Sequence, residues 1–261
     1  MDTQKHNLKF ISRDMIKFIA LITMVIGHFL IYTASELKAF GIPQPFLSWI
    51  MSAQFIAPPI FMFFITEGFQ YTRSKSKYAV RLLIFALLTQ IPFILCENMT
   101  LSFRLLFSQF NVIFGLLAGL ISLIILESKL KLPLKVLIIA VFMAAGNLLN
   151  IQWGGVYGLL FILTFYIFRE RPVIRMGVYT VIALLYTKLN LSLLIPMLLS
   201  VILITFFYNG EKGKYPNFSK YFMYIIYPIH YWIIYIVKYI AWHIGELYNS
   251  NIIKPKAAYG S

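Results

Sequence analysis

The stretch DMIKFIALITMVIGHFLIY, from Asp14 to Tyr32, is almost entirely apolar. About 20 such residues allow one helix to cross the hydrocarbon core of a bilayer. Similar runs recur along the chain, of whose 261 residues 60% are hydrophobic and only 12% are charged. Soluble domains carry roughly 25% charged residues. The sequence therefore predicts an all-α, polytopic integral membrane protein.

The apolar runs predict about nine transmembrane helices. Their ranges are 15–34, 46–66, 79–96, 109–126, 133–150, 153–168, 172–188, 191–208 and 218–242. The sixth and seventh runs are short for a straight span, so we expect them to be partial, tilted or packed away from lipid. The loops between the runs are short. We therefore expect residues 1–261 to form a single transmembrane domain.

Basic residues predict the orientation of the chain, because cytoplasmic loops of membrane proteins are enriched in Lys and Arg. If nine helices are threaded in turn, 17 of the 23 Lys and Arg residues fall on one side: Lys5, Lys9, Arg13, Lys17, Arg73, Lys75, Lys77, Arg81, Lys129, Lys131, Lys135, Arg169, Arg171, Arg175, Lys212, Lys214 and Lys220. The other side holds Lys38, Arg104, Lys188, Lys238, Lys254 and Lys256. We expect a cytoplasmic N-terminus and an external C-terminus. The length of the first run disfavours a cleaved signal peptide.

Charge and cysteine content exclude several classes of function. The net charge of +14 is spread over many short loops, so it indicates topology and not nucleic-acid binding. Cys96 is the single cysteine of the chain, so no intrachain disulfide can form. The four histidines and Cys96 also lack the short spacings of a zinc site, and we expect no metal.

Lys17 and His28 predict a functional groove along the first helix. They lie eleven residues apart, which places them on nearly the same helix face and about 16 Å apart along its axis. Lys17 then lies at the cytoplasmic boundary and His28 beyond the bilayer midplane. Ionisable groups at that depth indicate function, although a hydrogen bond between helices or a snorkelling lysine are the alternatives. An elongated donor with an anionic head and a reactive arm, such as acyl-coenzyme A, would suit this spacing.

Other polar residues interrupt the second, fourth and last runs. Pro58 and Pro59 predict a bend or break in the second helix, and Glu67 at its end could orient a catalytic group or pair with Arg81 or Lys17. His230 lies deep in the last helix and shares a face with Tyr227, so it either joins the site or packs among aromatic side chains.

Two further groups of polar residues have local explanations. Asn111 could cap the fourth helix or bond across helices. Asn147, Asn150, Gln152 and Trp153 precede two glycines and indicate first of all a tight turn.

Four stretches together carry a resemblance to a known family. They are SRDMIKFIALITMVIGH (12–28), IAPPIFMFFITEGFQYTRSKSKYAVRLLIFALLTQIPF (56–93), FNVIFGLLAGL (110–120) and KYFMYIIYPIH (220–230). In order and spacing they resemble the TraX family of F-pilin acetylation proteins, within the wider group of transmembrane acyltransferases. The resemblance covers residues 12 to 240. Gly27 stands where an aspartate is common in these proteins, Phe55 stands where an arginine is common, and the turn NIQWGGVYG lacks a frequent acidic residue.

The resemblance implies a membrane-embedded acetyltransferase. His28 would be the general base, with Glu67 and His230 in the catalytic site. Lys17 would bind the donor, acetyl-CoA, together with Arg13, Asp14, Tyr71, Arg81, Asn111 and Tyr227. The acceptor would be an amine or hydroxyl of a peptide, a glycan or a lipid-linked compound, such as the N-terminus of a membrane or exported peptide.

The expected location is the plasma membrane of a bacterial cell, with membrane lipids as surroundings. The alternative is a small proton-coupled transporter or flippase that uses the intramembrane histidines, since broken helices and ionisable groups near the midplane also occur in transporters.

Overall fold

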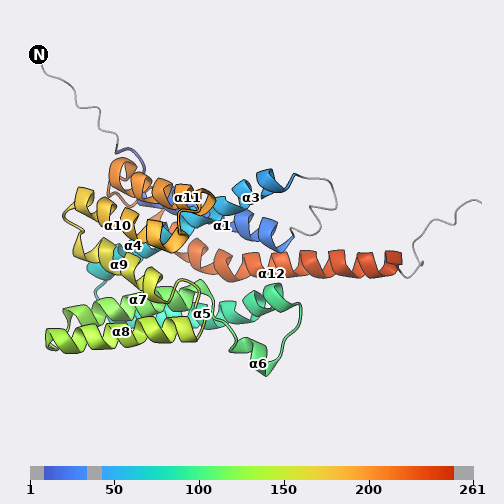
Figure 1. Ribbon diagram of the computed structural model, residues 1–261, viewed down its shortest axis with the longest axis horizontal. Coiled ribbons are helices and arrows are strands. Elements are labelled where there is room, and N and C mark those ends of the chain that lie inside the picture. Colours follow the sequence, from blue (N-terminus) through green and yellow to red (C-terminus); the bar gives the residue numbers. More distant parts are fainter. Residues whose placement is uncertain (1–8, 34–42, 250–261) are drawn as a thin grey trace, which may run out of the picture.

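The computed structural model describes residues 9–33 and 43–249, and over these residues it is all-helical, with no strand (Figure 1). The elements are α1 (Arg13–Tyr32), α3 (Gln44–Ser52), the 3₁₀ helix η1 (Ala53–Ile56), α4 (Ala57–Tyr71), α5 (Lys75–Asn98), α6 (Phe103–Leu106), α7 (Val112–Glu127), α8 (Leu132–Leu148), α9 (Val156–Ile167), α10 (Pro172–Thr187), α11 (Leu191–Ile202), the π-helix η2 (Leu203–Phe207) and α12 (Pro216–Asn249). The all-α prediction is confirmed for this part of the chain.

Each of the nine apolar ranges overlaps a helical segment, but the segments differ in length. Among the described residues, four helical segments are long and apolar enough to cross a membrane: Arg13–Tyr32, Gln44–Tyr71, Lys75–Asn98 and Pro216–Ile244. The remaining apolar helices are shorter than 18 residues. The number of spans and the orientation of the termini therefore stay predictions. Lys5, Lys38, Lys254 and Lys256, which enter the orientation argument, lie outside the described residues.

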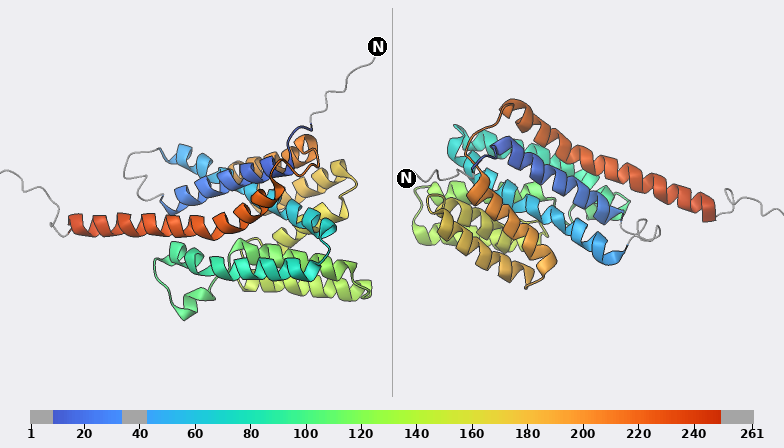
Figure 2. Two further views of the ribbon diagram at one scale, coloured as in Figure 1. Left: turned by 180° about the vertical axis from the view of Figure 1, so that it is seen from behind. Right: turned by 90° about the horizontal axis from the view of Figure 1, so that it is seen from above.

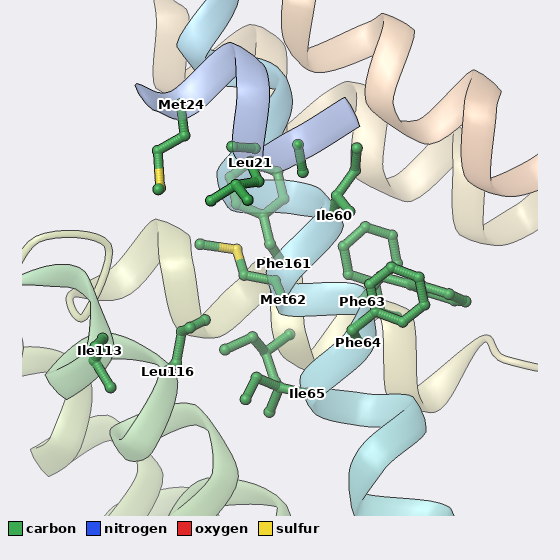
Figure 3. Close-up of a cluster of buried hydrophobic side chains, with 14 of the residues drawn as sticks. Leu21, Met24, Ile60, Met62, Phe63, Phe64, Ile65, Ile113, Leu116 and Phe161 are labelled. Carbon is green, nitrogen blue, oxygen red and sulfur yellow. The ribbon is translucent and has the colours of Figure 1, made fainter. Parts of the chain in front are cut away.

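Helix α4 forms the centre of the bundle. It packs against α1, α7, α9 and α11, and buried side chains occupy most of its positions (Figure 3). Figure 3 shows Ile60, Met62 and Phe63 of α4 among side chains from neighbouring helices. A helix that is apolar on all sides is typical of a buried position. Residues of α4 can therefore reach cavities on more than one side of the bundle.

The predicted break in the second run lies just before the prolines. The chain changes from α3 to η1 at Ala53 and returns to α-helix at Ala57, so that Pro58 and Pro59 fall in the first turn of α4. Proline is tolerated there because the first backbone N–H groups of a helix have no partner within it. The break brings η1 against α1, where His28 lies.

Polar contacts between helix ends lie at two opposite ends of the bundle. Arg13 at the start of α1 pairs with Glu67 of α4, and Glu127 at the end of α7 binds Lys75 and the Tyr166 hydroxyl. At the other end, the backbone of Gln152 donates to Phe110. The basic residues that enter these contacts, Arg13 and Lys75, thus belong to the set assigned to one side by sequence.

Helix α12 packs along α5 and α1, and its C-terminal half extends beyond the other helices (Figures 1 and 2). Ile233, Ile236 and Ile240 on this helix are more than half exposed. Helices α5, α8 and α10 also expose many large apolar side chains. Apolar surface of this extent is unusual on a soluble monomer and is typical of helices that face lipid.

Candidate functional site

His28 of α1 and His230 of α12 form a hydrogen-bonded pair in the interior. The Nδ1 atom of His28 lies 3.0 Å from the Nε2 atom of His230, and their rings are stacked. The Nδ1 atom of His230 lies 3.3 Å from the Ile226 carbonyl oxygen. His230 is 2% exposed. Tyr231 packs against both imidazoles.

The contacts of this pair indicate which ring nitrogen of each histidine carries a proton. A carbonyl oxygen only accepts hydrogen bonds, so Nδ1 of His230 is the donor to Ile226. The Nε2 atom of neutral His230 is then an acceptor, and Nδ1 of His28 donates to it. In the neutral form of His28 the remaining nitrogen, Nε2, keeps a free lone pair. The pair therefore leaves His28 in the tautomer that a general base requires.

Gly27 allows α1 to approach η1 next to His28. A Cβ atom at Gly27 would lie 2.4 Å from the Gln54 Cβ atom and 3.2 Å from the Met51 carbonyl oxygen. This distance leaves no room for a side chain without a shift of the helices. Position 27 therefore cannot carry an aspartate in this packing, and the side chain that forms a hydrogen bond with the His28 ring is His230 of α12.

A cavity of about 380 Å³ lies beside His28, and we refer to it as the His28 cavity. Polar side chains in its wall include Gln54, Asn147 and Gln152. Aromatic rings in its wall include Trp153, Tyr157, Tyr186 and Tyr227. The volume is within the range of small-molecule sites, ~300–1,000 Å³.

A second cavity, of about 150 Å³, is lined by Lys17, and we refer to it as the Lys17 cavity. Phe61, Val112 and Tyr227 belong to the walls of both cavities. Leu21, Phe64 and Leu116, which Figure 3 labels, lie around the Lys17 cavity. Lys17 and His28 thus line two adjoining cavities with a shared wall.

The Lys17 ammonium lies over an aromatic ring. Its Nζ atom is 4.9 Å from the centroid of the Phe64 ring. No ion pair of Lys17 is found among the described residues. A half-buried cation without a carboxylate partner remains available to bind an anion.

Glu67 lies in a separate cluster at the end of α4. Its Oε2 atom is 2.9 Å from the Arg13 Nε atom, and its Oε1 atom accepts a hydrogen bond of 2.6 Å from the Tyr208 hydroxyl. Of the partners considered from sequence, neither Arg81 nor Lys17 binds it. Glu67 lines neither cavity. In this arrangement Glu67 joins α1, α4 and the end of η2 and does not contact the histidines.

The other residues expected at the donor site occupy different places. Tyr227 is buried and lines both cavities. The Arg81 guanidinium lies 5.7 Å from the ring centroid of Tyr78, and Tyr78 lines the Lys17 cavity. Tyr71 is 74% exposed and lines neither cavity.

Asn111 and Asp14 are both buried outside the two cavities. The Asn111 side chain accepts from the Ile113 N–H at the start of α7 and donates to the Ala86 carbonyl of α5. It therefore caps its own helix and also bonds across helices. Asp14 lies against the 208–215 segment, where a Cβ atom at Gly213 would be 2.6 Å from its Oδ2 atom.

The turn between α8 and α9 forms a cavity wall, which the sequence did not predict. A Cβ atom at Gly115, Gly146 or Gly158 would lie within 2.5 Å of a backbone oxygen of this turn. These glycines come from α7, α8 and α9, so three helices leave space for the turn. Trp153 within it has a positive φ of 56°. The sequence signal was the group of amides and tryptophan between apolar runs, for which a tight turn was a sufficient explanation.

Acidic, cysteine and histidine side chains do not cluster as metal ligands in the described part of the chain. No group of three or more is close enough to hold an ion.

Comparisons with known proteins identify the family of this chain. The family model described as TraX protein matches residues 12–238. The "Probable fimbrial assembly protein FimC, serogroup H1" of Dichelobacter nodosus is 32% identical over 191 residues, which make up 66% of this chain and 75% of that protein. No solved structure matches the chain. The chain therefore belongs to the TraX family.

Proposed function

We propose that this protein is a membrane-embedded acyltransferase that moves an acetyl group from acetyl-CoA to an amine or hydroxyl acceptor. The observation that carries the proposal is the His28–His230 pair beside the 380 Å³ cavity, which adjoins a second cavity lined by Lys17. Membership of the TraX family, which is linked to pilin acetylation and fimbrial assembly, supports it.

The donor would extend across both cavities. Lys17 would bind its anionic head, since an ammonium attracts phosphate and Lys17 forms no ion pair with a carboxylate among the described residues. The thin thioester arm would pass the shared wall at Phe61, Val112 and Tyr227 and reach His28. Holding donor and acceptor together supplies a large part of the rate enhancement.

In the proposed reaction, the hydroxyl oxygen or amine nitrogen of the acceptor attacks the thioester carbonyl carbon. Nε2 of His28 takes the proton that this atom loses. The carbon–sulfur bond then breaks, and the proton on His28 passes to the coenzyme A thiolate. The products are the acetylated acceptor and free coenzyme A. General base catalysis of this kind contributes about 10²- to 10⁴-fold to the rate. His230 would keep Nδ1 of His28 engaged throughout.

The proposal is tested with purified protein in two measurements. Coenzyme A should raise the unfolding temperature in a concentration-dependent way, because a ligand that binds only the folded state stabilises it. Labelled acetyl-CoA should transfer its label to an acceptor in membrane extracts. His28→Ala should abolish transfer and keep the coenzyme A effect. His243→Ala, at an exposed histidine of α12, is the matched control and should behave like the wild type.

The outcomes separate an acyltransferase from the alternative class. Unchanged transfer by His28→Ala would remove His28 from the mechanism. A proton-coupled transporter has no reason to bind coenzyme A, so a protein that coenzyme A does not protect would favour that alternative.

A further inference from the structure

Arg175, in the first turn of α10, is a buried cation without a counter-charge in the described part of the chain. Its exposed fraction is 7%, and its Nε atom is buried without a hydrogen-bond partner there. The side chain forms no ion pair with any described residue, and its guanidinium lies 5.5 Å from the ring centroid of Phe63. Contact with one aromatic face offsets only part of the cost of removing a guanidinium from water.

The position of Arg175 on α10 directs its side chain into the bundle. Arg175, Tyr179 and Ala183 follow at intervals of four residues and are all buried, so they form one face of the helix. On this face the Tyr179 hydroxyl donates to the Met197 carbonyl of α11. Helical side chains lean toward the N-terminus of their helix. Arg175 therefore faces the interior and leans back toward the loop that joins α9 to α10.

The start of α10 supplies further groups that are suited to an anion. Arg171 at the N-cap makes no side-chain cap, and Pro172 at the first helical position has no N–H. The next two N–H groups, those of Val173 and Ile174, have no acceptor within the helix. Free N–H groups at a helix N-terminus carry a partial positive charge and attract anions. The buried Arg175 adds a full charge to this end of the helix.

The loop before α10 adds to the positive charge. Arg169 and Arg171 lie in it with one acidic residue, Glu170, whose Oε1 atom is 3.5 Å from the Arg169 Nε atom. Arg171 is exposed and forms no ion pair among the residues that the structure describes. Two arginines at this helix end, Arg171 and Arg175, are therefore available to an anionic ligand.

This group of residues is separate from the two cavities. Neither Arg171 nor Arg175 lines the His28 cavity or the Lys17 cavity. Lys17 lies over the ring of Phe64, and Arg175 lies over the ring of the preceding residue, Phe63. The two cations thus contact different rings of α4.

We propose that the start of α10 is a second anion site, which binds a phosphate group, and that Arg175 is its central ligand. A guanidinium presents several donors in one plane and can bind two phosphate oxygens at once. The N–H groups of Val173 and Ile174 bind the same group at the helix end, and Arg171 closes its exposed side. The site is independent of the proposed acyl transfer. Its phosphate belongs either to a soluble compound or to a phospholipid headgroup, which present the same oxygens.

Binding is tested with pyrophosphate and the purified protein, in maltoside micelles free of phosphate and phospholipid and at constant ionic strength. Pyrophosphate should raise the unfolding temperature of the wild type in a concentration-dependent way. Arg175→Gln should weaken the apparent affinity about 10- to 100-fold, and Arg175→Lys should keep part of it. Arg73→Gln, at an exposed arginine between α4 and α5, is the matched control and should bind like the wild type. Lys17→Ala should keep the response that depends on Arg175.

A second series with phosphatidylglycerol in the micelles distinguishes the two sources of phosphate. Stabilisation by pyrophosphate alone, lost in Arg175→Gln, identifies a soluble ligand, whereas stabilisation that requires the lipid and is lost in the same variant identifies a headgroup. Equal responses of Arg175→Gln and Arg73→Gln to both additions would overturn the proposal.

The stability of the protein without any phosphate separates binding from packing. Arg175→Gln should then be at least as stable as the wild type, because it removes a buried charge that has no partner. A loss of stability that is the same with and without pyrophosphate or lipid would show that Arg175 serves only to pack on Phe63. That result would also overturn the anion site.

Discussion

The Nδ1 atom of His28 and the Nε2 atom of His230 lie 3.0 Å apart, although 202 positions separate the two residues in the chain. Helices α1 and α12, near the two ends of the chain, pack side by side to make this contact. His230 in turn is held by the Ile226 carbonyl of its own helix. Two histidines that look alike in sequence therefore have different surroundings: His28 lines the cavity, and His230 lies outside its wall and forms a hydrogen bond with His28.

His230→Ala should lower kcat by about 10- to 100-fold and leave the KM for acetyl-CoA nearly unchanged. This is the usual cost of losing the partner that fixes a functional imidazole. His230→Gln should recover part of the loss, because its amide oxygen can accept from Nδ1 of His28. Steady-state kinetics over a range of pH give the measurement. Equal rates for the Ala and Gln variants, together with an unaltered pH profile, would show that His230 serves packing alone.

Lys17→Ala should weaken coenzyme A binding about 10- to 100-fold, the range expected when a hydrogen bond to a charged group is lost. Lys17→Arg should keep most of the affinity, because it keeps the positive charge. Titration calorimetry with coenzyme A measures both. Lys129→Ala provides the control, since it removes an exposed lysine from the loop after α7. The donor site lies elsewhere if Lys17→Ala and Lys129→Ala bind equally well.

Gly27→Ala should destabilise the protein by about 1–3 kcal/mol, as overpacked sites do. The new Cβ atom would meet Gln54 Cβ at 2.4 Å, so α1 and η1 must separate and His28 must move with α1. We expect a lower unfolding temperature and a lower kcat. Gly177→Ala is the matched control, because a Cβ atom there meets nothing within 4 Å. Similar unfolding temperatures for both variants would contradict the close packing at Gly27.

Arg13 and Glu67 should contribute to stability as one unit. Glu67→Gln and Arg13→Gln each leave a partly buried charge without its partner, so each should lower the unfolding temperature. The double variant should cost less than the sum of the two, because residues in direct contact are not additive. Unfolding curves of the four proteins complete the cycle. Additive effects would mean that the ion pair does not couple the two helices.

Much of this protein follows from local sequence. The apolar runs predict the helices because the length and polarity of a segment decide whether it can be buried in lipid or protein. Pro58 and Pro59 predict a break, which the structure places at η1, immediately before them. The positions of His28 and Lys17 on one face of α1 also follow from helical geometry alone, and both residues line cavities.

The partners of these residues depend on tertiary structure. Nothing near position 28 or 230 specifies that the two rings meet, since that contact requires α1 and α12 to pack together. The sequence offered Arg81 and Lys17 as partners of Glu67, whereas the helix ends bring Arg13 to it. The glycines of α7, α8 and α9 leave space for the turn that contains Trp153, and this space exists only because the three helices pack together. Sequence thus determined which segments are buried and which residues are costly to bury, whereas the packing of distant helices decided what each of them contacts.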